Sequence, residues 1–321
     1  MADLSGGLSR SALPGLGQDR SKHEGVRTWL QVGSYRVDGN VGGTQITLAD
    51  LRLPELMPFV SYDYERFALS SWESLQQAAA RASTSNAICW VLLQTYYAAF
   101  FAAHGLMRAC GEAVVKLEKP QTDVLQVSSD VMLTPSFTIE PAMYSVRVGQ
   151  EVGGNFTISL MKIPSKFGAH EGFWRIFDGF LDRLANRAVT RGDPEAASIV
   201  AGVAELQPVL RPHGSWRSPW LSAVRNEINY QHKHGVWRPR TLDKRAAATV
   251  SSISIVPSST VRLDYSLSRE TISAFTSASL YLATLSLEVA NTIAANSTAT
   301  RCFGSHWRRN RAEAAWTTVG S

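Results

Sequence analysis

The chain has 321 residues, of which 45% are hydrophobic and 18% are charged. This composition is that of a folded globular protein, and it excludes intrinsic disorder, a collagen helix and a coiled-coil rod. The net charge of +5 favours an acidic partner, such as nucleic acid or an anionic membrane.

The N-terminal part of the chain contains many turn signals. Residues 1–25 are rich in Gly and Ser and lack the apolar core of a signal peptide, so we expect a flexible lead-in. An Asp-Gly pair at 38–39 is typical of a hairpin turn and predicts two strands, at 29–37 and 43–48. We therefore expect a strand-rich N-terminal region at 26–65.

A helical domain is predicted for residues 70–297. It begins with an amphipathic helix, followed by a long helix that Ser83 caps and that ends at about Cys110. This long helix is apolar on nearly every side, so we expect it in the centre of the core. The aromatic side chains expected to pack there are those of Tyr96, Tyr97, Phe100 and Phe101.

The uncharged stretch at 82–107 is also long enough to cross a bilayer. Asn86, Gln94 and His104 interrupt it, and no basic cluster flanks either end, so a buried helix is the preferred interpretation. A second apolar stretch, after Glu270, is diluted by Ser and Thr. We therefore expect no membrane partner, and a membrane-associated effector remains an alternative.

The remaining elements follow from periodicity and turn signals. An inserted β-hairpin is expected at about 134–162, and a strand pair at 251–268. The basic tail at 298–321 is expected to be loose. Helices are predicted at 171–188, 194–206 and 270–295.

The segment that carries the chemistry is a predicted helix at 219–234, for which Gly235 is a natural stop. Arg225 and His232 are seven residues apart, so on a helix they differ by about 20° around the axis and about 10.5 Å along it. Asn229 lies between them on nearly the same face. We therefore expect these polar groups at the rim of a buried apolar stripe, where a groove can form.

Such a pair suits cleavage of RNA by its own 2′-hydroxyl. A histidine takes or gives a proton near neutral pH, and a guanidinium holds the scissile phosphate with two donors. No metal or other cofactor is expected, because no carboxylate or His/Cys cluster has ligand spacing. The three cysteines, Cys89, Cys110 and Cys302, indicate a reducing cytoplasm.

The octet from Arg225 to His232, Arg-Asn-Glu-Ile-Asn-Tyr-Gln-His, resembles the signature of the HEPN superfamily. That signature is an arginine, a polar residue and a short spacer that ends in histidine, on a late helix of an all-helical bundle. The tyrosine-rich stretch at 96–107, closed by Gly111, is similar to the family's early core helix. The resemblance covers about residues 70–111 and 171–295.

The resemblance implies a mainly α fold, with a HEPN-like helical bundle, β-hairpin insertions and a strand-rich N-terminal region. It also implies a metal-independent endoribonuclease of a bacterial toxin or anti-phage defence system, working as a homodimer with one composite cleft. Carried over to this chain, Arg225 and His232 are the catalytic pair, and Asn226 orients or supports them. The implied partners are RNA, a second copy of the chain, and an antitoxin or sensor that restrains the activity.

Basic residues gather around this segment. Between residues 208 and 245 the excess of basic over acidic residues is larger than the net charge of +5 of the whole chain. Tryptophan and tyrosine are interleaved with them, which is typical of a surface that follows a phosphate backbone and stacks on unpaired bases. The residues expected to bind RNA are Arg217, Asn229, Lys233, Arg238 and Arg240.

Other interpretations of these residues remain open. Arg225, His232 and Lys233 could lie on a solvated helix, where cations near the C-terminus complement the helix dipole. The basic cluster could bind an acidic face of another protein, and the module could bind RNA or a protein without catalysis. His234, on the opposite face of the predicted helix from Arg225, is the weaker catalytic candidate.

Overall fold

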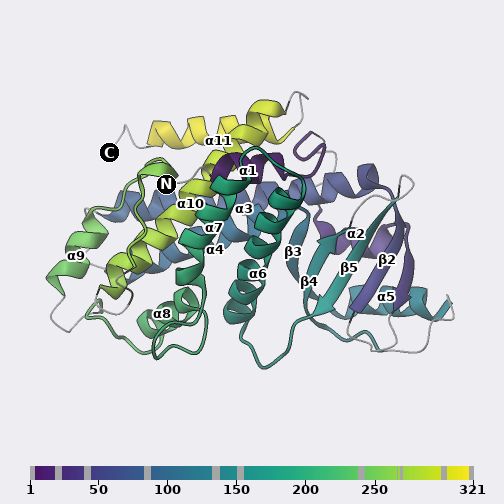
Figure 1. Ribbon diagram of the computed structural model, residues 1–321, viewed down its shortest axis with the longest axis horizontal. Coiled ribbons are helices and arrows are strands. Elements are labelled where there is room, and N and C mark those ends of the chain that lie inside the picture. The colour runs from purple at the N-terminus through teal and green to yellow at the C-terminus, as the bar shows by residue number, and fades with distance from the viewer. Residues whose placement is uncertain are drawn as a thin grey trace. The chain divides into compact units, whose positions relative to one another are not determined.

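The computed structural model describes residues 4–18, 24–39, 45–82, 88–131, 138–149, 155–237, 243–265, 267, 270–297 and 302–317. Its fold is mainly helical with one antiparallel sheet, which confirms the predicted fold class at this level (Figure 1). The chain forms two compact units. The first contains Met1–Ser11, Phe67–Leu106 and Phe173–Ala290, and the second contains Ala12–Arg66, Met107–Gly172 and Asn291–Ser321.

In the described residues of the first unit, all regular structure is helical. The helices that lie wholly or mainly in it are α1 (Leu4–Arg10), α4 (Ile88–Ala109), α6 (Ala169–Thr190), α7 (Ala196–Leu210), α8 (Trp220–Asn229), α9 (Lys244–Ser251) and α10 (Thr271–Asn296). Helix α3 (Leu53–Ala82) begins in the second unit and ends in the first. A single 3₁₀ turn lies at Ser258–Thr260.

Helix α4 provides the aromatic centre of the first unit. Tyr96 is fully buried, and its ring stacks on Phe275 of α10 with centroids 5.9 Å apart. Its hydroxyl accepts a hydrogen bond of 2.9 Å from the indole N–H of Trp174 on α6. His104 is a buried core histidine that stacks on Phe173 at 3.9 Å. The central position predicted for this helix is confirmed, although Trp90 near its beginning is exposed.

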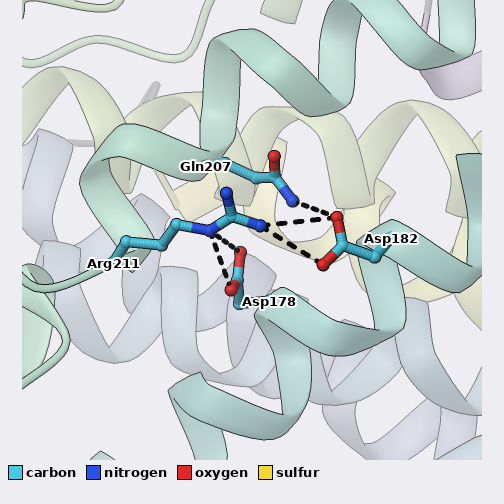
Figure 2. Close-up of polar contacts among 4 residues, drawn as sticks. All are labelled: Asp178, Asp182, Gln207 and Arg211. Atoms are coloured by element: carbon cyan, nitrogen blue, oxygen red, sulfur yellow. Dashed lines mark hydrogen bonds and ion pairs between the residues drawn. The ribbon is translucent and has the colours of Figure 1, made fainter.

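An exposed ion-pair cluster joins helices α6 and α7 (Figure 2). Asp178 and Asp182 are four residues apart and therefore share one face of α6. Arg211, just beyond α7, donates to Asp178 from Nε at 3.0 Å and to Asp182 from Nη2 at 3.2 Å. Gln207 also donates to Asp182. The end of α7 is thereby tied to α6, and the charge of Arg211 is offset within the fold.

The second unit contains the sheet. Its strands are β1 (Arg36–Gly39), β2 (Gln45–Leu51), β3 (Glu112–Leu117), β4 (Ala142–Val148) and β5 (Phe156–Lys162), and they run antiparallel in the order β1-β2-β5-β4-β3 (Figure 1). The pairing of β4 with β5 matches the hairpin predicted at 134–162, of which residues 134–137 and 150–154 lie outside the described part. Helices α2 (Val26–Val32), α5 (Lys119–Val131) and α11 (Phe303–Thr317) complete the unit.

The first predicted strand, at 29–37, is wrong except for its last two residues. Residues Val26–Val32 form helix α2, because Val26, Trp29 and Leu30 repeat at helical spacing and are all buried. Gly33 ends the helix, and only Arg36–Gly39 forms a strand. The hairpin partner is where we expect it, with Val37 opposite Leu48.

The strand pair predicted at 251–268 is also wrong in the described residues, which contain no strand there. Helices α10 and α7 provide hydrogen-bond acceptors for polar groups of this segment in place of a neighbouring strand. Glu288 of α10 accepts hydrogen bonds from the backbone N–H and the hydroxyl of Ser258, at 2.7 and 2.6 Å. The hydroxyl of Tyr265 donates to the carbonyl oxygen of Glu205 on α7 at 2.9 Å.

Both ends of the chain contain helices where we expect loose segments. Leu4 and Leu8 are four residues apart on α1, and both are buried. Phe303 and Trp307 have the same spacing on α11 and are also buried, and Trp307 donates to Asn291 at 2.9 Å. These short apolar repeats bury one side of each helix, which a loose segment would leave in water.

Among the described residues, one helix is long and apolar enough to cross a membrane, namely α10. In its most apolar window, 78% of the residues are buried inside the protein. The alternative membrane segment at 82–107 does not meet the same test over its described residues.

Candidate functional site

Helix α8 ends at Asn229, five residues before the predicted end. Beyond it, His232 and His234 adopt the left-handed conformation, with φ of 52° and 67°, and Gly235 follows at 64°. This conformation ends helices, and it is uncommon in residues other than glycine. Arg225 and His232 therefore do not share a helix face, and this part of the prediction is wrong.

Arg225 lies inside the protein, with 6% of its surface exposed. Its Nη2 donates to the hydroxyl oxygen of Tyr97 on α4 at 2.8 Å, and its Nη1 donates to the side-chain oxygen of Asn226 at 3.0 Å. Nε is buried and has no hydrogen-bond partner among the described residues. The guanidinium is thus engaged by the fold, whereas the predicted role requires it to face a phosphate.

Two tyrosines enclose this guanidinium. Its central carbon lies 5.8 Å from the ring of Tyr97 and 5.1 Å from the ring of Tyr230, which is 69% exposed. Burial lowers the pKa of Arg225, but the phenolic oxygens of Tyr97 and Tyr230 outweigh it and keep that pKa above its ordinary value. In return, a hydrogen bond with Arg225 lowers the pKa of Tyr230.

Glu227 holds the turn that follows α8. Its Oε1 accepts a hydrogen bond from Nζ of Lys233 at 2.7 Å, and its Oε2 lies 3.0 Å from Nε2 of His234. Its backbone carbonyl accepts the N–H of Lys233 at 3.1 Å. Burial raises the pKa of Glu227, but Lys233 and His234 reverse this and leave the pKa lowered. One carboxylate therefore fixes two neighbouring cationic or titratable side chains.

A hollow of about 530 Å³ opens beside this turn. Its wall includes Trp216, Glu227, Lys233, His234 and Arg245, together with the first turns of α9 and α10. The volume lies in the range of small-molecule sites. Its titratable and aromatic lining consists of the imidazole of His234, the indole ring of Trp216, the cations of Lys233 and Arg245, and the carboxylates of Glu227, Asp243 and Glu270.

His232 does not line this hollow in the described residues. It is exposed, and its ring contacts that of Trp237 in a tilted arrangement with centroids 4.9 Å apart. Trp237 in turn contacts Trp90 of α4, edge to face at 5.7 Å. The turn thus has His234 on the wall of the hollow and His232 in an aromatic contact.

The basic residues around the site are in very different states. Arg211 is paired with two aspartates, Lys233 is paired with Glu227, and Arg225 is buried. Arg217, Lys244 and Arg245 are exposed, and none of them has an ion pair within the described residues. The predicted RNA-binding residues Arg238 and Arg240 lie outside the described residues, and Asn229 is half-buried at the end of α8.

Two contacts of this region escape the sequence analysis, that of Glu227 with His234 and that of Arg225 with Tyr97. Glu227 and His234 are seven residues apart, so a continuous helix would separate them by about 10.5 Å. Trp90 and Tyr97 have the same spacing on α4, and this pattern could have indicated one shared face. In the described part of the chain, no three His, Cys, Asp or Glu side chains are grouped so as to hold a metal ion.

Comparison with known proteins gives no relative: no family model, no curated protein and no solved structure matches the chain.

Proposed function

We propose that the protein is an endoribonuclease that cuts RNA by attack of the 2′-hydroxyl, and that the hollow beyond helix α8 is its active site. The observation that carries the proposal is the contact of 3.0 Å between Glu227 and His234 on the wall of the hollow. A carboxylate that holds one ring nitrogen of a histidine fixes its tautomer and leaves the other nitrogen to transfer a proton.

The reaction follows from the groups on this wall. His234 takes the proton of the 2′-hydroxyl, and the oxygen attacks the neighbouring phosphorus. The bond from phosphorus to the 5′-oxygen breaks, and that oxygen leaves with a proton from the solvent that reaches the open hollow. Lys233 and Arg245 offset the charge that develops on the phosphate. The products carry a 2′,3′-cyclic phosphate and a 5′-hydroxyl.

The proposal changes the roles that the motif alone implies. Arg225 is buried and bonded to Tyr97 and Asn226, so we assign it to support the site and not to hold the phosphate. His232 is exposed and its ring contacts that of Trp237, so we assign it to binding. His234 and Glu227 take over the proton transfer. The left-handed conformation of both histidines supports a functional turn, because such strain is concentrated at functional sites.

The test is cleavage of single-stranded RNA by purified protein in EDTA. We expect His234→Ala to lower the rate about 100-fold or more, in line with the loss of a general base. Arg245→Ala should also lower it. The matched control is Lys244→Ala, because Lys244 is the preceding residue of α9, equally exposed, and absent from the wall of the hollow.

The two arrangements of the catalytic histidine give opposite results in this assay. Full activity of His234→Ala together with loss in His232→Ala would overturn our assignment and restore the motif's pair. If His234→Ala, His232→Ala and Arg245→Ala all cleave RNA at the wild-type rate, the reaction takes place elsewhere in the protein. Binding of RNA by all variants without any cleavage would favour the second candidate, a non-catalytic RNA-binding module, which the exposed aromatic rings beside α8 also suit.

We also propose that the helices of the first unit form a HEPN-like bundle that acts as a homodimer in the cytoplasm, in a toxin or antiviral defence system with a restraining partner. What supports this is the motif Arg225–His232 and the tyrosine-rich helix α4. Light scattering of the purified protein should give twice the chain mass of 35.1 kDa. A mass of one chain at concentrations that cleave RNA would exclude the composite cleft.

A further inference from the structure

Exposed aromatic rings lie along one face of helix α4 and the turn that follows α8. Trp90 is 54% exposed and contacts Trp237, whose ring also contacts that of His232. Seven residues after Trp90, Tyr97 holds Arg225, over which lies the ring of Tyr230. We name the residues Trp90, Tyr230, His232 and Trp237 the aromatic row.

Trp90 and Tyr97 share one face of helix α4. Residues seven apart on a helix are separated by about 10.5 Å along the axis. Trp90 contacts Trp237 at one end of this interval, and Tyr97 contacts Arg225, which lies against Tyr230, at the other end.

The chemistry of the row favours nucleic acid over a protein partner. Protein interfaces need a continuous apolar core, and the exposed aliphatic side chains of this unit lie elsewhere, on α6, α7 and the segment after α9. These are Val189, Val200, Ile255 and Val256. The exposed members of the row instead present ring faces, those of Trp90, Tyr230 and His232, on which bases can stack.

We infer that the aromatic row binds single-stranded RNA by stacking on unpaired bases, with Trp90, Tyr230 and His232 as its exposed rings. The inference rests on the proposed function for the identity of the ligand, and it adds how the strand is held beside the hollow. Stacking on a side chain does not depend on the base, so the row accepts any sequence but requires bases that are not paired.

The test measures binding separately from cleavage. The probe is a short 2′-O-methyl RNA with a fluorescent label, which cannot be cut through its 2′-oxygen, and affinity is read from anisotropy. We expect Trp90→Ala to weaken binding about 10-fold, the typical loss when one stacking ring is removed. Trp90→Phe should restore most of this loss. Trp90 is exposed, so its replacement leaves the core intact, which a melting curve verifies.

Two matched controls make the result specific. Tyr265→Ala removes another half-exposed ring of the same unit and should leave the affinity unchanged. A strand of equal length and charge that lacks its bases should bind wild type and Trp90→Ala equally weakly. If Trp90→Ala binds the RNA as tightly as Tyr265→Ala, the row is not a stacking site. The inference would also be overturned if the wild-type protein bound the base-free strand, a duplex or an oligoglutamate of equal charge as tightly as it binds the single-stranded RNA.

The binding experiment and the cleavage experiment can fail separately. If His234→Ala still cleaves but Trp90→Ala loses affinity, the row stands and the assignment of the active site falls. If Trp90→Ala binds normally while His234→Ala is inactive, the row falls and the active site stands.

Discussion

Arg225 on helix α8 and Tyr97 on helix α4 are joined by a hydrogen bond of 2.8 Å, from a buried guanidinium to a phenolic oxygen. This bond links helix α8, which carries the start of the Arg225–His232 motif, to the central helix of the first unit, α4. The arginine of the motif is therefore part of the packing between two helices.

Replacing Arg225 by Ala should destabilise the protein by about 2–4 kcal/mol, because the change removes two hydrogen bonds and leaves a cavity. Tyr97→Phe should cost about 1–3 kcal/mol, since it leaves a buried charged donor without its acceptor. Urea unfolding measures both. The control is the exposed Arg217→Ala, expected to change stability by less than about 0.5 kcal/mol. An Arg225→Ala variant with unchanged stability and no RNA cleavage would instead indicate a direct role in catalysis.

The carboxylate of Glu227 makes the turn at 230–237 sensitive to acid. Its pKa in the folded state is lower than the ordinary value of 4.5, so its contribution is present above about pH 4.5 and is lost as the pH falls through the folded value. Glu227→Gln should remove this dependence. Stability measured against pH for both proteins should converge in acid. If the stability curves of the two proteins stay parallel over the whole pH range, the carboxylate of Glu227 does not stabilise the turn.

Tyr35 predicts a loss of stability in alkali. Burial raises its pKa from 10.0 to about 12, and its hydroxyl donates to the carbonyl oxygen of Leu30. The folded state resists ionisation, so the contribution is full below about pH 10 and is lost as the pH rises towards about 12. Tyr35→Phe should lose about 1 kcal/mol at neutral pH and decline less between these values. The absorbance of tyrosinate during alkaline titration provides a separate reading.

Helix α11 should contribute measurably to the stability of the second unit. Trp307 is buried and bonded to Asn291, and Phe303 packs edge to face on Tyr64 with centroids 5.1 Å apart. Trp307→Ala should cost about 3–5 kcal/mol. Arg309→Ala, on the exposed side of the same helix, serves as the comparison. A loose C-terminal segment would give equal melting temperatures for these two variants.

Helices could be predicted from the sequence wherever an apolar stripe repeats over several turns. This holds for α4, α6 and α10, where the expected and observed ranges agree within a few residues. The shorter helices α2 and α11 escape prediction because only two or three of their large apolar side chains are buried among those the structure describes, a pattern that a loop also produces. The segment at 251–267 alternates like a strand, but its polar groups bond to distant helices. Ser258 donates to the carboxylate of Glu288, and the hydroxyl of Tyr265 donates to the backbone carbonyl of Glu205.

The candidate site could be predicted only in its location. The motif points to the segment in which cations and histidines are concentrated, and that segment borders the hollow. It cannot give the geometry, because Glu227 draws back the residues after Asn229 and brings His234 to 3.0 Å. A continuous helix would separate this pair by about 10.5 Å. The decisive contact forms between side chains that are not neighbours in a helix, and periodicity does not contain it.

Since one carboxylate holds both Lys233 and His234, and both histidines of the turn have strained backbones, the turn is expected to open locally as a single cooperative step. The amide protons of residues 231–235 should then exchange with solvent at one common rate, faster than those of α8. A ligand that occupies the hollow would slow this exchange for the whole group. Amide exchange at residues 231–235 would therefore detect ligand binding independently of any cleavage.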